Sequence, residues 1–144
     1  MAGASFLNQL GSMKDFNAFM DTFQNNEMAT AALPLLLQKV IVGLNFPMAC
    51  TFLFNAGYPD YVFPDPKVKR LLKDIGMTVS MDHYEALKIL IMMARYNKKP
   101  VAYVHKMLLL IGTGKLSDDG TKHLKRRNEF VDHIIPMLDI LINP

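Results

Sequence analysis

The chain has 144 residues, 51% of them hydrophobic, which is enough for one sizeable core but too short for two independent domains. A formal net charge of +3 is too small to establish nucleic-acid binding by itself. With Cys50 as the single cysteine, an intramolecular disulfide and a metal site built mainly from thiolates are both excluded. We therefore expect one helical domain over residues 1–144, in a reducing, cytoplasmic setting.

The most apolar stretch, residues 31–44, shows no sign of crossing a membrane. It is interrupted by Pro34, Lys39 and Gly43 and is shorter than a bilayer requires. The N-terminus lacks the basic start and apolar run of a secretory signal. We expect no membrane span.

Helix signals begin near the N-terminus. Residues 12–15 are typical of a helix start, and apolar side chains then recur at i, i+3, i+4 and i+7, at Phe16, Phe19, Met20 and Phe23. The polar residues 24–27 are expected to separate this helix from a second one over 34–42. That second helix is apolar on nearly every side and should be central, with Gly43 placed to end it.

Two proline-bearing turns predict the next two helices. Asn45 is a good N-cap and Pro47 is tolerated in a first turn, so the apolar run 48–54 should be helical and form a helix-turn-helix pair with its predecessor. Asp65 is likewise placed as an N-cap, with Pro66 at the first helical position of a helix that ends at Gly76.

The C-terminal half continues in the same way. One helix should run from residues 80–83 to about 97–99, and the next from Pro100 to the glycines of 112–114. A final helix over about 118–142 should be kinked by Pro136. The sequence thus predicts an all-α fold, a compact bundle of six or seven helices that contains a helix-hairpin-helix-like pair.

No residue pattern indicates a metal or a cofactor. The histidines are scattered, none is paired at i, i+4, and there is no CxxC; they lie at His83, His105, His123 and His133. Residues 112–114 are better explained as a helix stop than as a phosphate-binding loop. We expect neither a metal nor a cofactor.

The acidic turn at Asp65 carries the strongest functional signal. A carboxylate at a helix N-terminus accepts backbone N–H bonds and stays ionised, and the simplest interpretation is a cap. However, Asp65, Val68 and Arg70 match the Asp-Thr-His-Val-x-Arg segment of helix-hairpin-helix DNA glycosylases of the endonuclease III type, which residues 65–76 resemble.

The resemblance extends over about residues 42–116. The Leu-Pro-Gly-x-Gly-x-Lys-x-Ala hairpin of the family is matched in spacing more than in identity, by Gly43, Asn45, Pro47 and Ala49. Downstream, His105 and Gly112 resemble residues of the family's late helix. The cysteines that bind an iron–sulfur cluster in that family are absent, so no cluster is expected.

The resemblance implies double-stranded DNA as partner and Asp65 as the catalytic carboxylate, which would stabilise charge on the sugar or activate the nucleophile. Backbone N–H groups of the turn at Gly43, Asn45 and Pro47 would bind a phosphate. Because Pro47 stands where bifunctional members have a Schiff-base lysine, the resemblance implies monofunctional hydrolysis of the N-glycosidic bond of a damaged or mismatched base, without lyase activity through this position.

Basic and aromatic side chains surround the acidic turn. Two basic groups are candidates for phosphate contacts or are solvated helix faces: Lys67, Lys69, Arg70 and Lys73, and Lys122, Lys125, Arg126 and Arg127. Three aromatic residues are candidates for base stacking or pin the loop to the core: Tyr58, Tyr61 and Phe63.

The length of the chain leaves alternatives open. Only 42 residues precede the hairpin, and family members carry about twice as much, so part of the base pocket would be missing. Either another subunit of a homo-oligomer completes the pocket, or the chain is a non-catalytic helical DNA-binding or scaffold protein that kept the fold and lost the chemistry. A helical protein unrelated to DNA is the third alternative.

Overall fold

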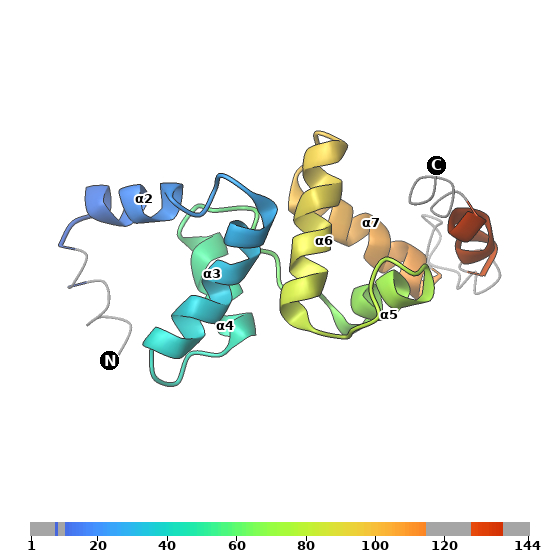
Figure 1. Cartoon of the computed structure of the whole chain (residues 1–144), viewed down its shortest axis with the longest axis horizontal. Helices are drawn as coiled ribbons and strands as arrows, with labels where there is room; N and C mark the ends of the chain where they lie inside the picture. The colour runs from blue at the N-terminus through green and yellow to red at the C-terminus, as the bar shows by residue number, and fades with distance from the viewer. Residues whose placement is uncertain (1–7, 9–10, 115–127, 137–144) are drawn as a thin grey trace.

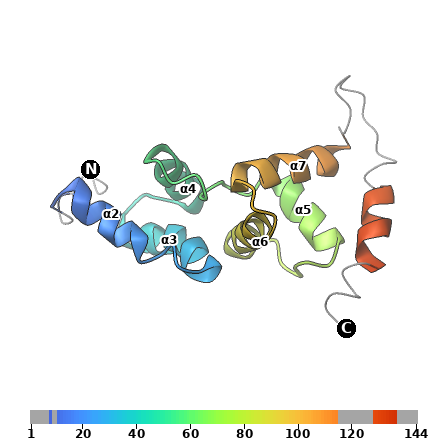
Figure 2. The same cartoon turned by 90° about the horizontal axis from the view of Figure 1, so that it is seen from above.

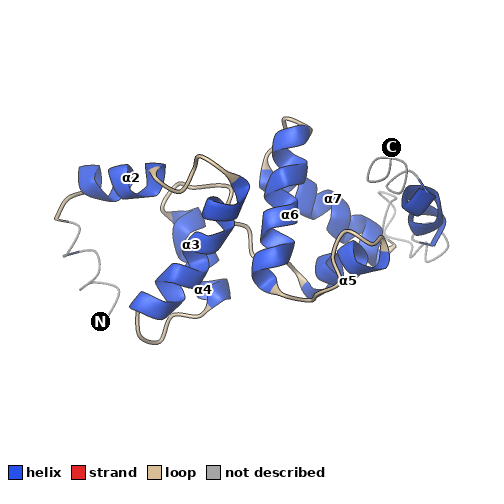
Figure 3. Cartoon of the chain, in the orientation of Figure 1, coloured by secondary structure: helices blue, strands red, loops and turns tan. Residues whose placement is uncertain are grey.

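The computed structural model describes residues 8, 11–114 and 128–136 (Figure 1). Within these ranges every regular element is a helix and no strand occurs (Figure 3), which confirms the all-α class. One helix covers residues 128–136, and six labelled helices precede it: α2 (Met13–Asp21), α3 (Glu27–Val40), α4 (Phe46–Asn55), α5 (Pro66–Asp74), α6 (His83–Tyr96) and α7 (Val101–Thr113).

The predicted N-caps are present. The side chain of Ser12 accepts a hydrogen bond from the N–H of Asp15 at the start of α2. Asn45 does the same for the N–H of Met48, at 2.9 Å, at the start of α4. These bonds satisfy N–H groups that have no partner inside the helix, so each cap fixes where its helix begins.

Helix α3 begins earlier than the sequence suggested. We expected it over 34–42, but it starts at Glu27 with Asn26 as N-cap, and Pro34 lies inside it. The polar residues 24–26 lie between α2 and α3, as expected, and Asn26 among them is the N-cap of α3. A proline inside a helix removes one backbone hydrogen bond. In α3 the side chain of Pro34 is buried in the core.

Two other predicted helix ends are confirmed, and the last predicted helix is described only in part. Helix α6 starts at His83, within the predicted range 80–83, and Asp82 is its N-cap. Helix α7 ends at Thr113, within the predicted glycine segment 112–114, and Gly114, with a φ of +70°, is its C-cap. The expected final helix is described only over 128–136, so Pro136 is its last described residue and the helix beyond it, which a kink would redirect, lies outside the described residues.

The helices form two groups that meet along α6. Figures 1 and 2 show α2, α3 and α4 at one end and α5 and α7 at the other, with α6 packed against α3 on one side and α7 on the other. Helices α3 and α4 pack together as the predicted helix-turn-helix pair. One cluster of buried side chains, from Phe16 in α2 to Ile111 in α7, continues across both groups.

Both ends of α6 are tied to the N-terminal group. At the C-terminal end, Nη2 of Arg95 donates to the carbonyl oxygen of Gln24 at 3.0 Å and to Oγ1 of Thr30 at 3.2 Å. Nη1 of Arg95 lies 3.3 Å from a carboxylate oxygen of Glu27. At the other end, the ring of His83 stacks on that of Phe46. None of the helices in the described part is both long and apolar enough to span a bilayer.

Candidate functional site

The turn before α4 is open to solvent. Gly43 has a φ of +84°, in the left-handed region that favours glycine, and its surroundings leave open space where a side chain would be. Val42 beside it is 87% exposed. Pro47 is the second residue of α4 and contributes no N–H, and the N–H of Leu44 already donates to the carbonyl oxygen of Ile41. The turn therefore offers the N–H groups of Gly43, Asn45 and Phe46 and the positive end of the α4 dipole.

Asp65 is held from two sides. Its Oδ1 accepts the N–H of Lys67 at 2.7 Å, which is the N-cap bond of α5, and its own N–H donates to Nε2 of His105 at 3.2 Å. Because Nε2 acts as an acceptor, the proton of this neutral imidazole is on Nδ1. Burial lowers the pKa of His105, and the Asp65 carboxylate opposes that shift. The acidic turn is thus fastened to α7.

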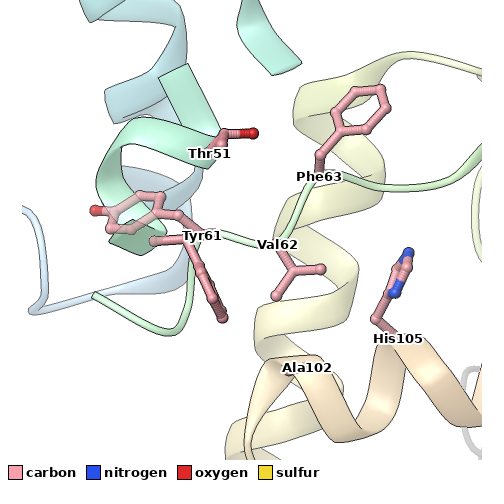
Figure 4. Close-up of a pocket in the computed structure, with 7 residues that line it drawn as sticks. Thr51, Tyr61, Val62, Phe63, Ala102 and His105 are labelled. Carbon is pink, nitrogen blue, oxygen red and sulfur yellow. The ribbon is translucent and has the colours of Figure 1, made fainter. Parts of the chain in front are cut away.

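A cavity of about 240 Å³ lies next to this turn (Figure 4). Helix α4, the segment before α5 and helix α7 enclose it, and the residues that line it are Thr51, Phe54, Tyr61, Val62, Phe63, Ala102 and His105. Its volume is below the range of about 300–1,000 Å³ that is typical of drug-sized ligands, so it suits a small group. Asp65 does not line the cavity itself, but its N–H donates to His105, which does. The turn at 43–47 is not part of the cavity wall.

The three aromatic candidates have different positions. Phe63 is partly buried and lines the cavity, where it could stack on a planar group. Tyr61 is 1% exposed and its hydroxyl accepts a hydrogen bond from Nε2 of Gln24 at 3.2 Å. The hydroxyl of Tyr58 donates to Oδ1 of Asn17 at 2.7 Å. Tyr58 and Tyr61 therefore fix the loop to α2 and the segment after it. Of the three residues, only Phe63 is still a candidate for stacking on a base.

The cations of α5 divide into two faces. Lys67, Arg70 and Lys73 are exposed and, three residues apart, share one side of the helix. Lys69 is only 7% exposed, and its Nζ lies 2.9 Å from Nδ1 of His83. Lys69 is therefore no longer a candidate for a phosphate contact, because its side chain is buried against α6. The second basic run, residues 122–127, lies outside the described residues.

Lys69 belongs to a cluster centred on His83. The imidazole of His83 stacks on Phe46 at a centroid distance of 5.4 Å and lies at 59° to the ring of Phe63, 5.1 Å away. Burial and the charge of Lys69 lower the pKa of His83, and Asp82 acts in the opposite direction. The cluster joins α4, α5, α6 and the segment before α5, so it connects the turn at 43–47 with the acidic turn.

Sequence reasoning missed the roles of both histidines. His105 appeared only as part of the family resemblance, and His83 only as a helix start, because their partners are 40 and 14 residues away in the chain. The one local signal at His83 was its position directly after the N-cap Asp82. Within the described ranges, no group of three or more His, Cys, Asp or Glu side chains is arranged to hold a metal ion.

Comparisons with protein-family models, with curated proteins and with solved structures found no match to this chain. Functional inference consequently rests on the site itself. The arrangement offers an exposed helix N-terminus, a row of three exposed cations and a small cavity lined by Phe63 and His105. Such features suit the binding of an anionic polymer that carries planar groups.

Proposed function

We propose that this chain binds double-stranded DNA through the turn at 43–47 and the exposed face of α5. The observation that carries the proposal is the row of Lys67, Arg70 and Lys73, which presents three cations on one side of α5 directly after the acidic turn. In Figure 1 the turn before α4 lies at the lower left and α5 lies in the other helical group, beyond α6, so the proposed binding edge runs between them along the lower side of the molecule. This edge combines side-chain cations with a helix N-terminus, the two kinds of group that bind phosphates.

Salt dependence tests this proposal. Each phosphate that the protein neutralises should contribute about −0.9 to the slope of log K against log salt concentration. We expect a double substitution, Arg70→Gln with Lys73→Gln, to reduce the slope by about 2 in fluorescence anisotropy titrations of a labelled duplex. Lys98→Gln with Lys99→Gln removes the same charge from the exposed α6–α7 connection and is the matched control. Equal losses for the two pairs would show that net charge, not this edge, determines binding.

A second candidate function is excision of a base by the monofunctional route. It is favoured by the position of Asp65, a partly buried residue whose backbone N–H donates to His105 in the cavity wall. In this proposal an extruded base enters the cavity and stacks on Phe63, while Asp65 stabilises positive charge that develops on the sugar. The capping bond occupies one carboxylate oxygen, Oδ1.

Asp65→Asn separates excision from binding. Asn caps helices about as well as Asp, so the substitution should change stability by no more than a few tenths of a kcal/mol and leave DNA binding intact. It should abolish the release of a base, measured as alkali-labile abasic sites in a panel of duplexes with damaged or mismatched bases. If the unmodified chain forms no abasic product at stoichiometric concentration, excision is refuted. DNA binding in the same samples would then favour the non-catalytic alternative.

A further inference from the structure

Two apolar hollows lie next to each other on the surface of the C-terminal group. They are open to solvent, have volumes of about 340 and 320 Å³, and are bounded by α6, α7 and the helix at residues 128–136. Each volume is within the range of about 300–1,000 Å³ that is typical of sites for small molecules. Because Met93, Leu108 and Phe130 belong to the walls of both, the hollows form one elongated groove, which we call the α6–α7 groove.

One end of the α6–α7 groove is apolar. Ile75, Met77, Met92 and Ile134 line this end. Met92 is 49% exposed, so apolar surface is in contact with water here. The amide of Asn97 also lies in the wall, but its Nδ2 already donates to the carbonyl oxygen of Met93 at 2.8 Å. Unbranched thioether side chains adapt to the shape of what they contact, and every methylene that leaves water adds to affinity. This end therefore suits a flexible hydrocarbon chain.

The other end of the groove contains a cation. Lys99 lines it, and its Nζ lies 5.8 Å from the centroid of the Tyr103 ring, which lines the same end. This cation–π contact holds the ammonium group beside the groove. Among the described residues, no carboxylate belongs to the wall of either hollow, and Lys99 forms no ion pair. The groove is therefore apolar at one end and positively charged at the other.

We propose that the α6–α7 groove binds a free long-chain carboxylate, with its anionic head at Lys99 and its hydrocarbon chain along Met93 and Phe130 towards Met92. Small-molecule sites combine apolar walls with a few polar groups that fix orientation, and here Lys99 is the group that pairs with the head. An uncharged chain would gain nothing from Lys99, and a bare anion would gain nothing from the thioether wall.

The site is separate from the proposed DNA-binding edge. In Figure 1 the α6–α7 connection, which carries Lys99, lies at the top, whereas the DNA-binding edge runs along the lower side. None of Lys67, Arg70 and Lys73 lines the groove. The two proposals can therefore fail independently of each other.

Displacement of cis-parinaric acid, a polyene fatty acid that fluoresces in apolar surroundings, tests this on the full-length chain. The probe is bound below its critical micelle concentration, and laurate or dodecanol is then added as competitor. Both should displace the probe. Lys99→Gln should weaken the binding of laurate about two- to fivefold, the range for an exposed ion pair. The same substitution should leave dodecanol unaffected, because the alcohol has the chain without the charge.

Lys98→Gln is the matched control, because Lys98 is the neighbouring exposed cation and does not line the groove. It should leave the affinity for laurate unchanged. Met92→Glu places a carboxylate at the apolar end and should weaken laurate and dodecanol at least tenfold, whereas Met28→Glu, at an exposed methionine of α3, should affect neither.

Three results would overturn the proposal. One is a chain from which laurate displaces no probe, and another is equal weakening by Lys98→Gln and Lys99→Gln. The third is co-sedimentation with anionic phosphatidylglycerol vesicles without any binding of monomeric laurate, because the ligand would then be a membrane surface and not a free carboxylate.

Discussion

The buried pair of Lys69 and His83 gives the sharpest test of the packing between α5 and α6. Nζ of Lys69 lies 2.9 Å from Nδ1 of His83, and the lysine is only 7% exposed. His83→Phe keeps an aromatic ring next to Phe46, on which His83 is stacked at 24°. The substitution removes the acceptor and leaves a buried ammonium group without this partner.

The magnitude follows from the chemistry of the pair. A hydrogen bond to a charged group contributes about 1.5–3 kcal/mol, and a charged donor left unsatisfied in the interior costs at least as much. We expect His83→Phe to lower the free energy of unfolding by about 2–3 kcal/mol. Lys69→Met removes the ammonium group but keeps an apolar stem of similar length. Because the burial cost of the charge is removed together with its bond, this change should cost less than about 1 kcal/mol.

A double-mutant cycle, with free energies of unfolding from urea denaturation, measures the coupling energy between Lys69 and His83. In the Lys69→Met background, His83→Phe should cost less than about 1 kcal/mol, which gives a coupling energy of about 2 kcal/mol. A coupling below about 0.5 kcal/mol, the usual limit of additivity, would refute the reasoning. Such a result would mean that the ammonium group of Lys69 becomes hydrated when the imidazole is absent.

Three further predictions concern pH, a helix contact and a cap. Burial holds the pKa values of His83 and His105 below the ordinary 6.5, so their contribution to stability is present above pH 6.5 and is lost as the pH falls through the lowered values. The urea midpoint should therefore be lower at pH 5.5 than at pH 7.5, and an unchanged midpoint would contradict this. At Gly112, an added Cβ would lie 3.2 Å from the carbonyl oxygen of Lys67. Gly112→Val should therefore cost about 1–3 kcal/mol in thermal unfolding, and a chain as stable as the original would disprove the close contact of α5 and α7. Asp65→Ala should cost about 0.5–2 kcal/mol in the same assay, and a loss equally large for Asp65→Asn would show that the cap bond is not the cause.

Helix α6 connects the two helical groups at both of its ends. Arg95 binds the α2–α3 connection at one end, and His83 contacts Phe46 of α4 at the other. The proposed DNA-binding edge draws on both groups, with the turn at 43–47 from one and α5 from the other. Changes in the packing of α6 would therefore alter the spacing of the two proposed phosphate contacts.

Local interactions explain why most helix starts could be predicted. A cap such as Ser12 or Asn45 bonds to an N–H only three residues ahead, so residue identity and position are sufficient. The prediction was wrong for α3, where Asn26 caps a helix that continues through Pro34. Proline usually marks a first turn, and only the packing of α3 in the core shows that it is tolerated within this helix.

The sequence by itself determined the all-α class, the caps at Asn45 and Asp65, and the position of the left-handed turn at Gly43, because each depends on residues close together in the chain. Tertiary structure decided which charges are available. Four cations are spaced along α5, but the packing of α5 against α6 turns Lys69 inward and leaves the other three at the surface. The bond from Asp65 to His105 joins residues 40 positions apart. No local pattern encodes such a contact, since it forms only when α7 packs beside α5.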